Sequence, residues 1–156
     1  MGAVQSNNYV SSNRKRGIYF YKENEYNLIT NNYVSLNGYG IHIDDYSNNN
    51  KIHHNNFINN TNQAYGSSAS SLWDSVYPNG GNYWSDYNGT DVNKDGIGDT
   101  PYNISYGQGE QMVLDRYPLM KQNGTPQQNV TVTPGFEISW VIFSAVIIFV
   151  LKRIQL

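Results

Sequence analysis

The fold of this chain is decided by residues 17–60, which read GIYFYKENEYNLITNNYVSLNGYGIHIDDYSNNNKIHHNNFINN. In this stretch the tetrapeptide GIYF, residues 17–20, returns 23 residues later as GIHI, residues 40–43. A period in the low twenties with short alternating strands is typical of a solenoid in which each copy forms one coil. We therefore expect stacked coils whose strands pair about 4.8 Å apart.

The asparagines follow the same period. Residues 32–37 read N-x-V-x-x-N and residues 55–60 read N-x-F-x-x-N, while an earlier copy at residues 8–13 lies one residue further back. Stacking places Asn32 over Asn55, so the sequence predicts an asparagine ladder. Stacked amides at a turn satisfy one another and the backbone groups that a buried turn otherwise leaves unpaired.

Alternation along each strand separates the interior of the solenoid from its surface. Tyr19 and His42 alternate with apolar positions and are expected to point outward. The positions expected to fill the interior are Ile18, Phe20, Ile29, Val34, Ile41, Ile43, Ile52 and Phe57.

These repeats resemble a known group. The pattern N-x-I-x-x-N-x-[VF]-x-x-N…G-I-x-[FI] is similar to the right-handed parallel β-helix repeats of archaeal surface proteins, often named after the periplasmic copper-binding protein NosD. Residues 64–87, 91–102 and 115–120 (AYGSSASSLWDSVYPNGGNYWSDY, DVNKDGIGDTPY and DRYPLM) resemble the segment that closes the β-helix in that group. The resemblance implies the fold and leaves the activity open, because such helices host lyases, hydrolases, binders and spacers.

The chain is expected to be all-β, with a C-terminal hydrophobic helix added. β-Helix coils are predicted over residues 1–63, an aromatic and acidic closing segment over 64–120, a polar linker over 121–134, and a sorting signal with an apolar helix over 135–156. Only two to three coils fall within the chain, so we expect a fragment of a longer protein whose first coil exposes a strand edge. That edge is a candidate for self-association.

An acidic loop predicts a calcium site. Asp91, Asn93, Asp95 and Asp99 occupy positions 1, 3, 5 and 9 of a loop that has a glycine at position 6, and Ile97 at position 7 offers its backbone carbonyl. Such alternating oxygens suit a hard cation. Tyr102 stands at position 12, where an EF-hand has glutamate, so another ligand or water is needed. The alternative is an ordinary Asp/Asn/Gly-rich turn.

Aromatic residues gather before that loop. Trp73, Tyr83, Trp84 and Tyr87, together with Tyr77, could stack on sugar rings, or they could form a lid over the open end of the β-helix. The sequence favours the lid, because an uncovered coil end needs a large apolar cap.

Catalysis and copper binding are the rival functions. The acids of the coils are Glu23, Glu25, Asp44 and Asp45, and nothing in the sequence fixes a catalytic pair among them. Copper prefers imidazole and thioether ligands, and the histidines are His42, His53 and His54. Adjacent histidines in a strand point to opposite faces, so His53 and His54 can share one centre only at a bend.

The C-terminal end is predicted to be directed to a membrane. Residues 138–151 form an apolar run that precedes Lys152 and Arg153. With Pro134-Gly135-Phe136-Glu137 ahead of it, this order resembles the PGF-CTERM sorting signal of archaeal surface proteins. The resemblance implies recognition by an archaeosortase, removal of the helix and attachment of a lipid anchor, as in a GPI signal.

The remaining features agree with a location outside the cell. The N-x-S/T sequons begin at Asn59, Asn88, Asn103, Asn123 and Asn129, the last two in the expected linker. Charged residues make up 14% of the chain and the net charge is −2, so no basic field exists to attract nucleic acid. We expect a membrane-anchored surface protein for display, adhesion or binding of envelope polysaccharide; the alternatives are a lyase or hydrolase whose catalytic coils lie upstream, and a copper-handling protein.

Overall fold

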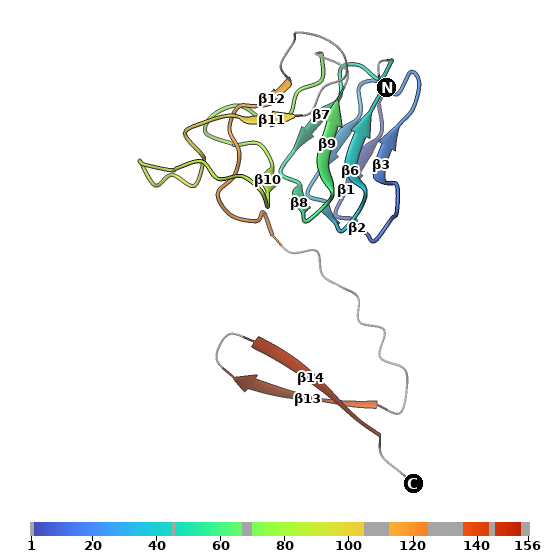
Figure 1. Ribbon diagram of the computed structural model, residues 1–156, viewed down its shortest axis with the longest axis vertical. Coiled ribbons are helices and arrows are strands. Elements are labelled where there is room, and N and C mark those ends of the chain that lie inside the picture. The colour runs from blue at the N-terminus through green and yellow to red at the C-terminus, as the bar shows by residue number, and fades with distance from the viewer. Residues whose placement is uncertain are drawn as a thin grey trace. The chain divides into compact units, whose positions relative to one another are not determined.

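The computed structural model describes residues 2–44, 46–66, 70–104, 113–124, 136–143 and 146–153. The chain divides into two units, Met1–Pro126 and Gln127–Leu156. The first unit is a parallel β-helix of about three coils with a closing segment (Figure 1).

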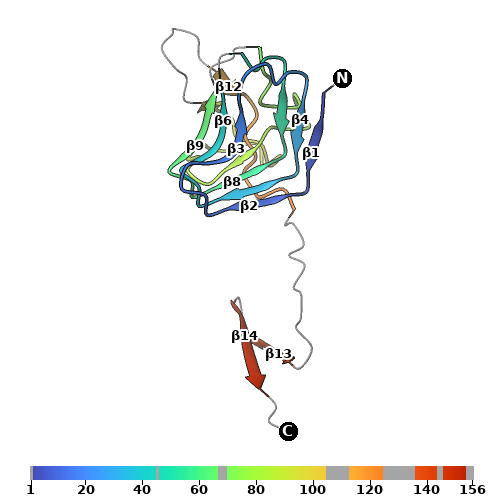
Figure 2. The same cartoon turned by 90° about the vertical axis from the view of Figure 1, so that its right-hand side faces the viewer.

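Each coil contributes one strand to each of three parallel sheets, which surround one interior (Figure 2). The sheets have the orders β1-β4-β7, β10-β8-β5-β2 and β3-β6-β9. The bounds are β1 (Val4–Ser6), β2 (Tyr9–Ser11), β3 (Arg16–Phe20), β4 (Leu28–Thr30), β5 (Tyr33–Ser35), β6 (Tyr39–Ile43), β7 (Lys51–His53), β8 (Asn56–Ile58), β9 (Asn62–Gly66) and β10 (Tyr83–Trp84).

The register confirms the repeat. Ile18 pairs with Ile41 across β3 and β6, an offset of 23 residues, whereas Val10 pairs with Val34 across β2 and β5, an offset of 24. The extra residue of the first copy therefore lies in the turn between β2 and β3, formed by residues 12–15.

The predicted interior is also confirmed. Every apolar side chain expected inside is buried, from Ile18, at 8% exposed, to Ile29, Val34 and Phe57, at 0%. Tyr19 points outward and is 40% exposed. Burying these eight side chains is the main driving force for the coils, since each contributes on the order of 1.5–3 kcal/mol.

The asparagine ladder forms as predicted and is longer than the sequence indicated. The Nδ2 of Asn8 donates to the Oδ1 of Asn32, that of Asn32 to Asn55, and that of Asn55 to Asn82, with donor–acceptor distances of 2.9, 2.9 and 3.0 Å. The amides of Asn32, Asn55 and Asn82 also donate to main-chain carbonyls, as Asn55 does to Ile29 and His53. The buried corners of the coils are thus satisfied internally.

A second ladder stands at the next corner of the coils. Asn13 donates to Asn37, Asn37 donates to Asn60, and Asn60 donates to the Oε1 of Gln63. In both ladders the side-chain donors point toward the C-terminal end of the β-helix.

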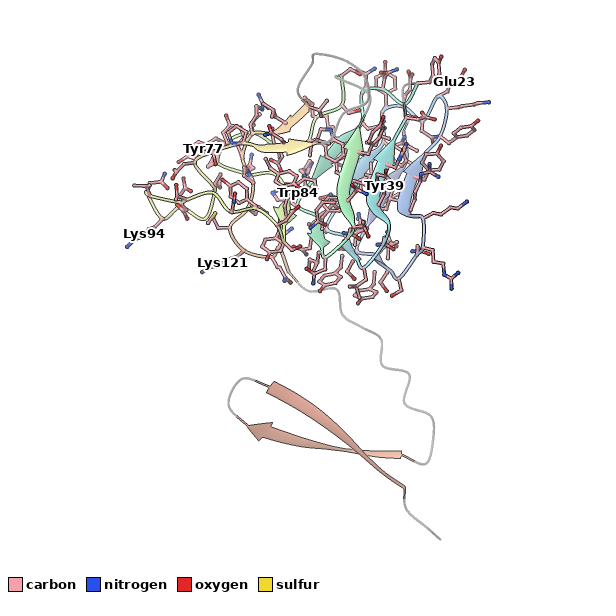
Figure 3. The ribbon with its side chains drawn as sticks, viewed as in Figure 1. Glu23, Tyr39, Tyr77, Trp84, Lys94 and Lys121 are labelled. Atoms are coloured by element: carbon pink, nitrogen blue, oxygen red, sulfur yellow. The ribbon has the colours of Figure 1, made fainter. Side chains whose placement is uncertain are left out.

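The closing segment covers that end. Trp84 of β10 stacks on Phe57 of the third coil with ring centroids 4.6 Å apart, and Tyr102 stacks on Trp84 at 4.3 Å. Trp73 and Trp84 are each 1% exposed. The lid favoured by the sequence is therefore present, and Trp84 lies between the coils and the closing segment (Figure 3).

A buried carboxylate ends the first ladder. Asp115, the last residue of β12 (Val113–Asp115), pairs antiparallel with β11 (Tyr102–Ile104) and is 0% exposed. Its Oδ2 accepts from the backbone N–H of Asn82 at 2.7 Å and from the Nε1 of Trp84 at 2.9 Å. Burial raises the pKa of Asp115 to about 7.

The second unit differs from the sequence prediction. β13 (Phe136–Phe143) and β14 (Val146–Arg153) form an antiparallel pair, where residues 138–151 were expected to be helical. The run is rich in valine, isoleucine and phenylalanine, whose branched and aromatic side chains favour strands. Among the residues that the structure describes, no helix has the length and apolar character needed to cross a membrane.

Candidate metal centre

Two adjacent histidines meet at a corner of the third coil. His53 ends β7, and His54 follows it with φ +59°, in the left-handed region. This turn removes the alternation that would send the two side chains to opposite faces. The Nδ1 atoms of the two rings lie 2.9 Å apart and the ring planes are nearly perpendicular, at 88°.

The orientation of His54 is fixed from two sides. Its backbone N–H donates to the carbonyl of Gly81 at 2.6 Å. Its Nε2 lies 2.7 Å from the carbonyl oxygen of Asn79. Because a carbonyl can only accept, this contact assigns the ring proton to Nε2 and leaves a lone pair on Nδ1, which is the usual way in which an outer partner orients a metal-binding imidazole.

The surroundings of His53 favour its neutral form. Burial lowers the pKa of His53, and the charges of His54 and Lys51 lower it further, while Asp74 opposes them. A neutral imidazole is the form that binds metal, so this environment favours a ligand role near neutral pH.

The charge of Asp74 raises the pKa of His53, but the carboxylate itself is hydrogen-bonded to Arg116. Its Oδ2 accepts from the Nε of Arg116 at 2.8 Å, and its Oδ1 from the Nη2 at 2.7 Å. Burial works against ionisation, yet the hydrogen bonds from Arg116 outweigh it and lower the pKa of Asp74. Asp74 therefore acts on His53 as a fixed charge.

The spacing of the two nitrogens fits one metal ion. Two imidazoles bound at about 2.0 Å and at a right angle place their nitrogens about 2.9 Å apart, which suits the square-planar preference of Cu(II). Such an ion would be held by the Nδ1 of His53 and the Nδ1 of His54. Among the described residues no group of three or more His, Asp or Glu side chains could hold a metal, so this centre would keep open coordination positions.

The predicted calcium loop is ordered by its own hydrogen bonds. The carboxylate of Asp91 accepts from the backbone N–H groups of Asp95 and Gly96, and Asp95 accepts from that of Ile97. Asn93 contacts Asp95 through its side-chain amide. Gly96 has φ +88°, as the sharp turn requires. Lys94 lies at the tip of this loop, away from the coils (Figure 3).

Asp99 is turned to a different part of the loop. Its Oδ2 accepts from the backbone N–H of Val92 and from the hydroxyl of Thr90. Tyr102, at the position of the missing glutamate, instead donates to Asp86 and stacks on Trp84.

The aromatic residues proposed for sugar binding are divided by the structure. Trp73 and Trp84 are covered on their faces by the core, so neither can serve as a sugar platform. Tyr83 and Tyr87 are half-buried, and the hydroxyl of Tyr87 donates to the carbonyl of Thr100 at 2.7 Å.

The other candidate residues of the coils do not converge. His42 lies on β6, stacked against Tyr65 with ring centroids 4.6 Å apart, and not in the pair formed by His53 and His54. Asp44 accepts from the backbone N–H of Lys22 and from Ser47, which makes it a turn residue. Glu23 and Glu25 are exposed, and Asp45 lies outside the described residues.

The sequons are unequal in access. Asn59, Asn88 and Asn103 are exposed, whereas Asn123 is half-buried, and its Nδ2 donates to Asn31 and to the carbonyl of His54. Asn123 is therefore packed against the β-helix, although the sequence suggested an open linker. Asn129, Pro134 and Gly135 lie outside the described residues, and Phe136 and Glu137 begin β13.

Sequence reasoning missed the residues that support the histidine pair. Asn79, Gly81, Asp74 and Arg116 come from the closing segment, 20 or more residues away from His54. The signal that could have found the pair is the phase of the repeat. His54 stands immediately before the ladder residue Asn55, at a corner where the chain bends.

Comparison with known proteins gives a consistent result. The family model described as "Periplasmic copper-binding protein (NosD)" matches residues 4–89. Two proteins named "Probable ABC transporter binding protein NosD" are similar. That of Stutzerimonas stutzeri is 34% identical over 102 residues, which is 65% of this chain and 23% of the relative. That of Pseudomonas aeruginosa strain PAO1 is 40% identical over 78 residues, 49% of this chain and 18% of the relative.

The chain thus spans about a quarter or less of the length of these relatives. No solved structure matches it.

Proposed function

This chain belongs to the NosD family, and from that premise we propose that it is an extracytoplasmic copper-binding β-helix module with its metal centre at His53 and His54. The observation that carries the proposal is the approach of the two Nδ1 atoms to 2.9 Å at a bend of the coil. The description of the family as periplasmic supports the proposed location, and its description as copper-binding supports the proposed metal. The name of the relatives adds an ABC transporter as the proposed partner of the whole protein.

The centre is suited to holding copper reversibly. Two protein ligands leave further positions of the metal for water or for a donor from another molecule, and a metal held by few ligands exchanges more readily than one in a closed tetrahedral site. The hydrogen bond from Nε2 of His54 to Asn79 fixes the ring before metal arrives. A metal bound at both Nδ1 atoms would take the place of the hydrogen bond between them, so copper binding is expected to release a proton.

The test is a titration of the full chain with Cu(II), in which binding is measured by calorimetry and by electron paramagnetic resonance. We expect about one equivalent bound with nitrogen hyperfine structure from imidazoles. The double variant His53→Gln/His54→Gln should lose this binding, while the matched control His42→Gln should keep it. Retention of the signal in the double variant, or its loss in the control, would contradict the assignment.

Calcium remains a separate proposal for the acidic loop. The Gly96 turn and the bonding of Asp91 to loop N–H groups support it, because they preorganise the first half of the loop. Asp99 would have to act through water, as position 9 of such loops often does. Calcium should raise the Tm of the wild type, and Asp91→Ala should abolish this rise. A wild-type Tm that calcium leaves unchanged would mean that the loop is an ordinary turn and not a calcium site.

The anchoring at the cell surface is likewise proposed. It is supported by the order Pro134-Gly135-Phe136-Glu137, apolar run, Lys152-Arg153, which is similar to an archaeal PGF-CTERM signal. Mass spectrometry of the protein from its own host decides this. A C-terminus ending near residue 134 with a lipid attached, and glycans on the exposed sequons Asn59, Asn88 or Asn103, is the expected result. An intact C-terminus would contradict the proposed cleavage by an archaeosortase.

A further inference from the structure

A hollow on the flank of the β-helix lies beside three consecutive cations at the turn between β2 and β3. Its volume is about 460 Å³. It is lined by Arg14, Lys15, Arg16, Gly38, Tyr39, Thr61 and Asn62. Because this lining comes from three successive coils, the hollow lies along the side of the solenoid and not at either end. A further coil stacked on the first one would lengthen this side without covering it.

The three cations, Arg14, Lys15 and Arg16, gather positive charge at one corner. Within the described residues none of them has an acidic partner, since the recorded salt bridge joins Arg116 to Asp74 in the closing segment. Among the same residues, the Nε of Arg16 is buried and has no recorded hydrogen-bond partner. A buried donor without an acceptor is costly. The corner therefore offers charge and N–H groups that a bound anion would satisfy.

Arg16 also adjoins a cluster of aromatic rings on the outer face of β3, β6 and β9. Its Cζ lies 4.2 Å from the ring centroid of Tyr19, which is exposed. The ring of His42 lies 5.1 Å from that of Tyr19 and 5.4 Å from that of Tyr39. Tyr65 of the third coil lies 6.2 Å from Tyr39. Each coil thus adds at least one ring to this face, on which Tyr39 is labelled in Figure 3.

Cations and rings side by side suit an acidic sugar. Flat amphipathic rings such as Tyr19 and Tyr39 can stack on the faces of pyranoses. The planar guanidinium of Arg16 can bind a carboxylate through two N–H groups. Thr61 and Asn62 are both exposed and offer a hydroxyl and an amide for the hydroxyls of a sugar. An inorganic anion would use the cations alone, so the rings favour a saccharide.

We propose that this flank binds an acidic polysaccharide, whose sugar rings carry carboxylates. One carboxylate occupies the hollow and pairs with Arg14 and Arg16. Neighbouring sugar rings of the same polymer lie against Tyr19 and Tyr39. The site is separate from the tryptophans of the closing segment, whose faces the core covers, and it needs no metal.

The test is a calorimetric titration of the full chain with hexagalacturonate, in the presence of EDTA so that calcium cannot bridge the carboxylates. We expect saturable binding. The variant Arg14→Gln/Arg16→Gln should bind at least about tenfold more weakly, because two charge-assisted contacts are lost. The matched control Lys94→Gln/Lys121→Gln removes the same charge from the closing segment and should keep the wild-type affinity (Figure 3). If circular dichroism shows that the arginine variant is unfolded, Arg14→Gln/Lys15→Gln, at two exposed turn positions, replaces it.

Two further probes separate the sugar from its charge. The methyl ester of hexagalacturonate keeps the rings and hydroxyls and should bind at least about tenfold more weakly than the acid. Tyr39→Ala should weaken the binding of hexagalacturonate severalfold and leave that of polyglutamate unchanged. The absence of binding, or an equal loss in the lysine control, would overturn the proposal. Equal affinity for polyglutamate without an effect of Tyr39→Ala would mean a general attraction of anions and would overturn the assignment to a sugar. None of these readouts involves copper, so they stand apart from the test of the metal centre.

Discussion

Replacing Asn55 with alanine tests the ladder where it is deepest. Asn55 is 0% exposed. Its Oδ1 accepts from the backbone N–H and from the Nδ2 of Asn32, at 3.0 and 2.9 Å. Its Nδ2 donates to the carbonyls of Ile29 and His53 and to the Oδ1 of Asn82. All of these bonds are lost in Asn55→Ala.

The expected loss of stability follows from this inventory. Each buried hydrogen bond contributes about 1 kcal/mol net, and a buried donor or acceptor left without a partner costs about 1–3 kcal/mol. The Nδ2 of Asn32 keeps other partners, in the carbonyls of Gln5 and Thr30, but its backbone N–H does not. We therefore expect Asn55→Ala to lower the free energy of unfolding by about 3–5 kcal/mol, a large share of the 5–15 kcal/mol typical of a domain.

The matched control is Asn8→Ala, at the exposed end of the same ladder. It removes one recorded side-chain hydrogen bond, to Asn32, which water can replace, so we expect a loss of about 1 kcal/mol or less. Both variants are measured by urea unfolding followed by near-ultraviolet circular dichroism. A third variant, Asn55→Asp, keeps the shape but turns oxygen toward two carbonyls and should be as damaging as alanine. If Asn55→Ala cost no more than Asn8→Ala, the ladder would not be a source of stability.

Three further changes have defined outcomes. The folded pKa of Asp115 is about 7 and lies above its unfolded value of 3.8. Its contribution to stability is therefore fully present below about pH 4 and is lost as the pH rises to 7, by at most about 4 kcal/mol. Urea midpoints between pH 5 and 8 should fall with this slope in the wild type and not in Asp115→Asn, and equal slopes in the two proteins would contradict the prediction. Asp74→Asn should lower the pKa of His53 further, because the carboxylate raises it, and a proton NMR titration that shows no downward shift would refute this. Trp84→Leu, which opens the lid, should weaken copper binding severalfold in the calorimetric titration, and an unchanged affinity would separate the lid from the metal centre.

The coils were predictable because the same contact recurs. A side chain such as Ile41 meets the equivalent residue of the coil above and below, so the sequence period alone fixes its partner. The same 23-residue period places Asn32 over Asn55 and so predicts the ladder. The lid could be anticipated for a different reason, since two tryptophans next to an open coil end have few other places to be buried.

The candidate site was not predictable in the same way. The bend at His54 repeats the left-handed residue that precedes the other ladder asparagines, as at Asn7 and Asn31, so only the phase of the repeat could have indicated it. Asn79, Asp115 and Arg116 belong to the segment that follows the last coil, where no period exists to assign neighbours. The apolar C-terminal run has the length of a helix, but its branched and aromatic side chains favour strands, so the sequence carries two opposing signals.

The metal centre and the lid depend on the same few hydrogen bonds. His54 donates through its backbone N–H to Gly81, and Gly81 donates in turn to the carbonyl of Tyr117 at 2.6 Å. Asn82, the next residue, is the last asparagine of the ladder and is bound to Asp115. The turn that offers its carbonyl to His54 is thereby fastened between the third coil and β12. Loosening the lid would free that turn and with it the ring.

In this arrangement the proposed copper binding would be thermodynamically linked to closure of the β-helix. A ligand that binds the closed form alone stabilises it by RT ln(1 + [L]/Kd), about 2.7 kcal/mol at a hundredfold excess over Kd. The linkage is reciprocal, so whatever holds the lid shut would also tighten the proposed binding of copper. Asp115 takes part in both, because its pKa of about 7 places a buried charge at the foot of the ladder near neutral pH. Acidification that neutralises this carboxylate should stabilise the lid, while protons at the same time compete with copper for the imidazole nitrogens. The two effects have opposite signs, and comparing Asp115→Asn with the wild type across that pH range separates them.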